Sequence, residues 1–86
     1  MLEEITEVKI DLKNASQLAL FVQSERKEQH VTQIQLAQLS NVGVRFIRDL
    51  EDGKETLQLD KVLRVLDTLG SNVTLSSATG EELWKR

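Results

Sequence analysis

The stretch that decides the fold is residues 32–54, which reads TQIQLAQLSNVGVRFIRDLEDGK. Thr32 is a favourable helix N-cap, and the apolar spacing after it predicts a short helix that ends at about Ser40. Asn41 then suits a left-handed turn residue. A second short helix is predicted from about Val44 to Leu50, followed by a helix-ending Asp-Gly pair. The stretch therefore predicts two short helices joined by a three-residue turn.

Small and apolar side chains would hold these two helices at a fixed angle. Ala37 falls where two crossing helices would approach closely, so a small side chain is needed there. The side chains expected to lock the pair are those of Leu36, Val42, Ile47 and Leu50. This combination of spacing and pattern is that of a helix-turn-helix.

The flanking sequence predicts two further helices and a short strand at each end. Asn14 is a good N-cap for a helix over about residues 15–29. A strongly apolar run predicts another helix over about 59–69. Apolar and polar residues alternate at 8–12 and again at 72–76, which is typical of half-buried strands. We therefore expect a mostly α bundle of about four helices.

The chain length of 86 residues allows one small domain. We predict a single domain at residues 1–76, with its helical core at 14–70, and a flexible C-terminal tail at 77–86. The sequence has no apolar run long enough to span a membrane and no signal-peptide pattern. We expect a cytoplasmic protein that binds no membrane.

The composition argues against an enzyme. The chain has no cysteine, no tyrosine and one histidine. It also lacks a glycine-rich phosphate loop and a carboxylate cluster within an apolar stretch. We therefore expect no catalytic residues, no metal site and no cofactor.

The charge distribution bears on the choice of partner. The formal net charge of −3 argues against a nucleic-acid partner. Residues 1–11 carry four acids and one base, whereas residues 12–86 carry ten of each. The acidity thus belongs to the N-terminal segment, and it argues less strongly against binding of DNA by the helix-turn-helix than the net charge suggests. One module of this charge would bind a phosphate backbone weakly, so a homodimer on a palindromic double-stranded operator is expected, with half-sites ~34–36 Å apart. The predicted strands are candidates for that dimer, although they could also pair within one chain.

The helix-turn-helix residues resemble a known family. Thr32–Ala37, Val42–Phe46 and Ile47–Lys54 are similar to the lambda-repressor/Xre class of DNA-binding domains, over roughly residues 16–70. In that class, residues at the positions of Arg26 and Glu51 form an ion pair, so the resemblance implies a structural pair here. The sequence departs from the class at position 40, where a serine occupies a position that is usually aliphatic. We therefore expect slightly wet packing there, in which water reaches the buried face of this helix.

Within that class, the chain is most similar to HipB-type antitoxins. The segments that carry this resemblance are Gly43–Lys54, Leu59–Leu63, Leu69–Gly70 and Val73–Leu75. HipB-type antitoxins are small autorepressors that bind a HipA-like kinase toxin. The resemblance thus implies a sequence-specific repressor of its own operon with a kinase toxin as partner. A free-standing Xre-type regulator, or a protein-interaction module on the same fold, remains as an alternative.

The candidate DNA-binding residues follow from how such a motif docks. The N-terminal residues of a recognition helix face base edges, so Arg45 is expected to read guanine and Val44 to touch a thymine methyl group. Arg48 could reach a base or a phosphate. Gln33 starts a helix whose amides attract phosphate, and the resembling family uses a glutamine here for backbone contact. Lys54 is expected near the next phosphate. The alternative is that these cations form a merely solvated face.

Three residues outside this set invite their own hypotheses. Phe46 could touch DNA, pack under the last helix or contribute to a dimer. Leu83 and Trp84 are the apolar residues of a polar tail, and tryptophan is enriched in binding interfaces. We expect these two to dock into the kinase partner, with folding back onto the domain or the dimer mate as the alternative.

Overall fold

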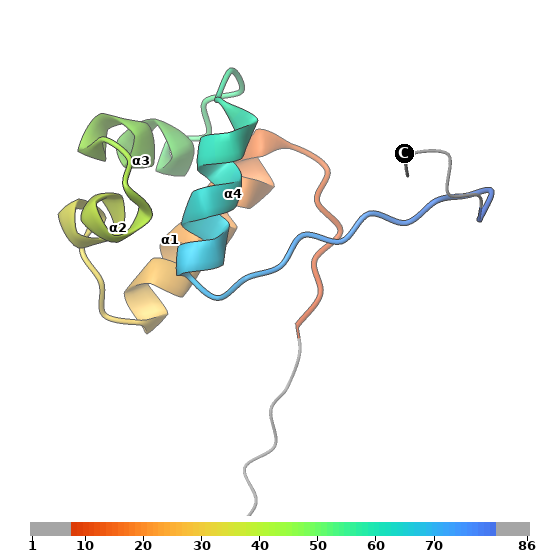
Figure 1. Ribbon diagram of the computed structural model, residues 1–86, viewed down its shortest axis with the longest axis horizontal. Coiled ribbons are helices and arrows are strands. Elements are labelled where there is room, and N and C mark those ends of the chain that lie inside the picture. The colour runs from red at the N-terminus through yellow and green to blue at the C-terminus, as the bar shows by residue number, and fades with distance from the viewer. Residues whose placement is uncertain (1–7, 81–86) are drawn as a thin grey trace, which may run out of the picture.

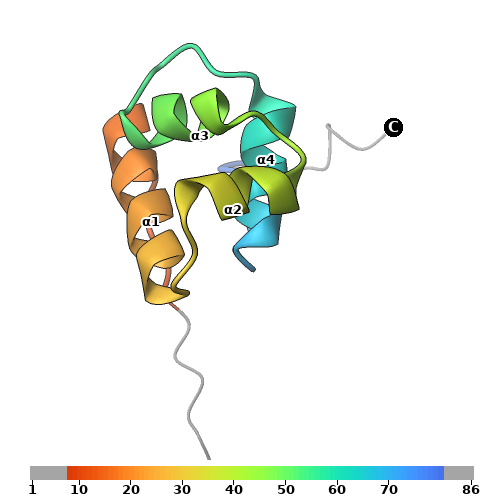
Figure 2. The same cartoon turned by 90° about the vertical axis from the view of Figure 1, so that its left-hand side faces the viewer.

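The computed structural model describes residues 8–80, and that range contains four helices (Figure 1). Their bounds are α1 Ala15–Glu28, α2 Gln33–Ser40, α3 Val44–Glu51 and α4 Leu59–Thr68. Each helix lies within one residue of its predicted bounds. Figure 2 shows α2 and α3 on the face turned toward the viewer, with α1 and α4 at the two sides. The predicted mostly α, lambda-repressor-like bundle is confirmed.

Side-chain caps explain where the first two helices begin. The Asn14 side chain accepts a hydrogen bond from the backbone N–H of Gln17 at 2.9 Å. Thr32 and Gln35 form a reciprocal capping box at the start of α2. Each such cap satisfies helix amides that have no partner within the helix. Both predicted N-caps are confirmed.

Residues in the left-handed backbone region end α1 and α2. His30 follows α1 with φ of 58°, and Asn41 follows α2 with φ of 56°. Asparagine tolerates this region because its short polar side chain can bond locally. The N–H of Val42 then donates to the carbonyl of Ala37 at 3.0 Å, which closes the predicted turn between α2 and α3.

All four helices contribute to one apolar core. The predicted locking residues Leu36, Ile47 and Leu50 are fully buried, and Val42 packs half-buried against them. The remaining core side chains are those of Val22, Ala37, Val62, Val65, Leu66 and Leu69. Burying one large aliphatic side chain contributes about 1.5–3 kcal/mol, so α3 is held firmly against its neighbours.

Ser40 occupies the usually aliphatic slot without being left unpaired. Its side chain is buried, and its hydroxyl donates to Thr68 Oγ1 at 3.0 Å. Thr68 in turn donates to the carbonyl of Arg64. The expected wet packing is thus replaced by a side-chain hydrogen bond between α2 and α4.

The segments before α1 and after α4 leave the bundle as extended chain. No strand is present at 8–12 or 72–76 in the described part of the chain. A strand needs a neighbour to satisfy its backbone groups, and neither segment has one among residues 8–80 of a single chain. Both segments lie on the side of the bundle away from α2 and α3 (Figure 1). Their pairing across two chains stays a prediction.

Within residues 8–80, no helix is long and apolar enough to cross a bilayer.

Candidate nucleic-acid interface

Helix α3 presents one apolar and one charged face. Ile47 and Leu50 point into the core, while Arg45 and Arg48 are exposed on the other side. The Arg45 side chain is 84% exposed. Because the apolar face fixes α3 beside α2, the two arginines are held on an ordered helix and not on a loop.

Three charged residues, Arg45, Asp49 and Lys54, form a group that we call the exposed cluster. Arg45 Nε lies 3.2 Å from Asp49 Oδ1, one helical turn away. Lys54 Nζ lies 3.6 Å from the other carboxylate oxygen, Asp49 Oδ2. The backbone N–H of Lys54 also donates to the carbonyl of Asp49 at 3.0 Å. Asp49 therefore connects the predicted base reader with the predicted phosphate contact.

The side chains of Val44 and Phe46 pack against the core and are only partly exposed. Both are half-buried and lie against the apolar core. The ammonium of Lys61 sits 5.9 Å from the centre of the Phe46 ring. Of the three alternatives for Phe46, the structure thus supports packing. Only part of the Val44 side chain remains available for the predicted contact with a thymine methyl group.

A second group joins α1, α2 and α3. It consists of Arg26, Gln33 and Glu51, and we call it the buried cluster. Arg26 Nε donates to Glu51 Oε2 at 2.6 Å, and Arg26 Nη2 donates to Glu51 Oε1 at 2.9 Å. Arg26 Nη1 donates to the carbonyl of Val31 at 3.0 Å. The ion pair implied by the family resemblance is present. The hydrogen bond to Glu51 raises the pKa of Arg26 above its ordinary value, although burial opposes the rise.

Gln33 is the third member of the buried cluster. Its Nε2 donates to Glu51 Oε1 at 3.1 Å. A carboxamide nitrogen carries two hydrogens, so Gln33 keeps one donor and its oxygen for another partner. Its position at the start of α2 is the one predicted for a contact with the DNA backbone.

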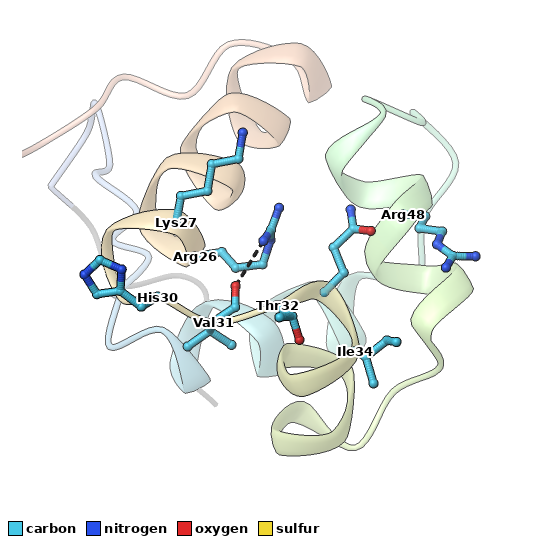
Figure 3. Close-up of a pocket in the computed structure, with 8 residues that line it drawn as sticks. Arg26, Lys27, His30, Val31, Thr32, Ile34 and Arg48 are labelled. Carbon is cyan, nitrogen blue, oxygen red and sulfur yellow. Dashed lines mark hydrogen bonds between the residues drawn. The ribbon is translucent and has the colours of Figure 1, made fainter.

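A hollow of about 510 Å³ opens beside the start of α2. Figure 3 shows Lys27 of α1 on one side and Arg48 of α3 on the other, with the Arg26 guanidinium between them. The remaining lining residues are His30, Val31, Thr32, Gln33 and Ile34. The hollow thus has one cation on each side of a helix N-terminus, neither of which forms an ion pair within residues 8–80, and such an arrangement attracts anions.

The sequence analysis assigned no role to two residues of the candidate interface, Lys27 and Asp49. The structure places Lys27 at the hollow, although no role was predicted for it. Asp49 is the second, because neither of its two ion pairs was predicted. The spacing of four residues between Arg45 and Asp49 is a signal that could have found the first of these pairs. The predicted partner-binding residues Leu83 and Trp84 lie outside the described residues.

The sequence comparison identifies one family. Residues 22–75 match the model of the helix-turn-helix family. The chain is also similar to the HTH-type transcriptional regulator y4mF of Sinorhizobium fredii (strain NBRC 101917 / NGR234), with 45% identity over 64 residues. That alignment covers 74% of this chain and 84% of the relative.

Solved structures with the same fold include HipB complexes. The HipB-O4 20mer complex superposes with a TM-score of 0.73 at 23% identity, and it covers 81% of this chain and 99% of that one. The HipA-HipB-O2-O3 complex gives a TM-score of 0.73 at 21% identity with the same coverage. At this level of identity the likeness establishes the arrangement of the helices.

Proposed function

This chain belongs to the helix-turn-helix family, as a transcriptional regulator of the lambda-repressor/Xre class, and on that premise we propose that it is a sequence-specific repressor. The family is one of DNA-binding transcriptional regulators and not a class of enzymes. The observation that carries the proposal is the face of α3, where Arg45 and Arg48 are exposed opposite the buried Ile47 and Leu50.

In the proposed complex, α3 lies in the major groove. Arg45 stands in its first turn, where a recognition helix meets base edges. A guanidinium can bond O6 and N7 of guanine at once, which makes arginine a good reader of that base. Val44 offers apolar contact to a neighbouring base through the part of its side chain that the core leaves free.

The remaining site residues are proposed to hold the DNA backbone. Gln33 has one amide hydrogen free at the start of α2, and Lys54 lies beyond the end of α3. Arg48 faces the hollow at the start of α2, which favours a phosphate over a base as its partner. Contacts of this kind fix the register of the protein on DNA without reading sequence.

The proposed active form is a homodimer on a palindromic operator. The chain from residue 12 onward has balanced charge, so one copy neutralises few phosphates and binds weakly. Two copies double these contacts. The extended segments at 8–12 and 72–76 carry exposed apolar side chains on the side away from α3, where a second copy would not obstruct DNA.

We further propose that the chain is the antitoxin of a HipA-like kinase toxin and represses its own operon. Support comes from the resemblance to HipB-type antitoxins and from the shared fold with HipB in a HipA-HipB complex. The proposed kinase contacts are Leu83 and Trp84 in the polar tail. A free-standing cytoplasmic regulator without a toxin is the second candidate, favoured by the name of the 45% identical relative, which mentions regulation alone.

Fluorescence anisotropy tests the repressor proposal. The labelled probe is the duplex that lies upstream of this chain's own gene, and the control is the same duplex with its bases shuffled. We expect tighter binding to the native duplex and an affinity that falls steeply with salt, because phosphate contacts release counterions. Equal affinity for both duplexes would contradict sequence-specific repression.

Co-expression with the neighbouring gene product tests the antitoxin proposal. We expect that product to be kinase-like, to arrest growth alone and to co-purify with this chain. Removal of residues 81–86 should then weaken the complex and leave operator binding intact. A neighbourhood without a kinase-like gene would support the free-standing regulator instead.

A further inference from the structure

Asp49 is an acid within the face of α3 that is proposed to meet DNA. Its side chain is only 21% exposed, whereas those of Arg45 and Lys54 are 84% and 52% exposed. Each oxygen of its carboxylate faces a different cation. An acid on such a surface repels phosphate, so its presence calls for a role that offsets this repulsion.

The contact with Arg45 involves the inner nitrogen of the guanidinium. Asp49 Oδ1 faces Nε of Arg45 at 3.2 Å. The two terminal nitrogens of the guanidinium are therefore free to project away from the helix. These are the groups that can form two parallel hydrogen bonds with guanine. An arginine held by Nε loses less side-chain freedom on binding than one that must be ordered by the DNA itself.

We propose that Asp49 is a specificity-determining positioning residue, which holds Arg45 for base reading and restrains Arg45 and Lys54 from binding phosphates indiscriminately. This inference rests on the proposed DNA-binding function. Base readout is strengthened because Arg45 arrives in a fixed orientation. Attraction to arbitrary DNA is weakened because the carboxylate of Asp49 offsets one of the two positive charges of Arg45 and Lys54. The carboxylate thus raises the affinity for the specific sequence and lowers the affinity for arbitrary DNA, and both effects increase the ratio of specific to non-specific affinity.

The test compares D49N with the charge-matched control D52N. Asp52 is exposed at the end of α3, and within residues 8–80 its carboxylate makes no ion pair. Both variants raise the net charge equally, but only D49N releases Arg45 and Lys54. Binding is measured on the duplex that wild-type protein enriches from a random-sequence pool, on its single-base variants and on the unselected pool.

We expect D49N to bind the unselected pool more tightly, with a salt slope steeper by about one per protomer. Its discrimination at the base pair read by Arg45 should fall by about five- to tenfold, since a bidentate pair discriminates by at least that factor. D52N should keep wild-type discrimination. A purely structural role for Asp49 would instead lower both affinities together and reduce the thermal midpoint.

A double variant separates positioning from direct contact. In an R45A background, D49N should cause no further loss of discrimination, because Asp49 acts through Arg45. A further loss would mean that Asp49 touches a base itself and would overturn the proposal, as would unchanged discrimination in D49N alone. A wild-type chain that enriches no sequence would instead contradict the proposed function, and this inference would fall with it.

Discussion

The buried and the exposed cluster each take their acid from α3 and differ in burial, although these two acids are only two residues apart. The Glu51 side chain is 2% exposed and the Asp49 side chain is 21% exposed. Two residues turn a helix by about 200°, so the two carboxylates point to nearly opposite faces. The same chemical pairing of arginine with a carboxylate thus serves the interior at one position and the surface at the other.

Burial decides what each cluster can do. In the buried cluster, both carboxylate oxygens of Glu51 accept hydrogen bonds, and no buried side-chain nitrogen or oxygen in the described residues lacks a partner. Such a cluster cannot change partners without leaving a charge unpaired. Exposed ion pairs contribute only about 0–1 kcal/mol, so Asp49 adds little to stability, and the terminal nitrogens of Arg45 and the ammonium of Lys54 stay accessible to DNA. The comparison assigns stability to the first cluster and binding to the second.

The largest expected effect is on stability, from Arg26→Ala. Removal of the guanidinium leaves Glu51 buried and without its main partner, which should cost about 3–5 kcal/mol. Denaturant midpoints measure the loss. Replacing both residues with apolar ones of similar size, as in Arg26→Met with Glu51→Leu, should cost less than the single change. Equal denaturant midpoints for wild type and Arg26→Ala would show that the buried cluster contributes no more to stability than the exposed cluster does.

The next effect is on base discrimination, from Arg45→Ala. The side chain is exposed, so the denaturant midpoint should stay near wild type. Affinity for the preferred operator should fall by about 1–3 kcal/mol, with relaxed discrimination at one base pair per half-site. A binding series on single-base operator variants provides the measurement. If Arg45→Ala weakens binding to every operator variant equally, then Arg45 positions the protein on the DNA and does not read a base.

Gln33→Ala tests a residue that belongs to the buried cluster yet borders the proposed interface. Glu51 keeps both hydrogen bonds from Arg26 in this variant, so stability should fall by only about 1 kcal/mol, the value of one hydrogen bond. Operator and shuffled duplexes should lose affinity by the same factor, because a phosphate contact carries no sequence information. Loss confined to the operator would assign Gln33 to base reading.

The smallest expected effect comes from Lys54→Ala. Its ion pair with Asp49 is long and exposed, so stability should change by less than about 0.5 kcal/mol. The dependence of affinity on salt should become shallower by about one unit per protomer, as expected for one phosphate contact. An unchanged slope would remove Lys54 from the interface.

The sequence was sufficient for the helices but not for most contacts between polar side chains, and the ion pair of Arg26 with Glu51 was expected only through the family resemblance. Local signals such as the caps at Asn14 and Thr32 fix where helices begin, and these were predicted. The bond between Gln33 and Glu51 joins residues 18 positions apart, and it depends on how α2 and α3 cross. The extended chain at 8–12 also escaped prediction, because alternation indicates a strand only where a partner strand exists.

The central claim is that the face formed by α2 and α3 contacts DNA while the buried ion pair between Arg26 and Glu51 only maintains the fold. An amide-resolved NMR titration of the protein with its enriched operator duplex tests this most directly. The account predicts the largest shift changes at the start of α2 and along residues 43–49, with a protected Arg26 side chain that shifts little. Changes concentrated at 8–12 and 73–75, with α3 unaffected, would contradict it.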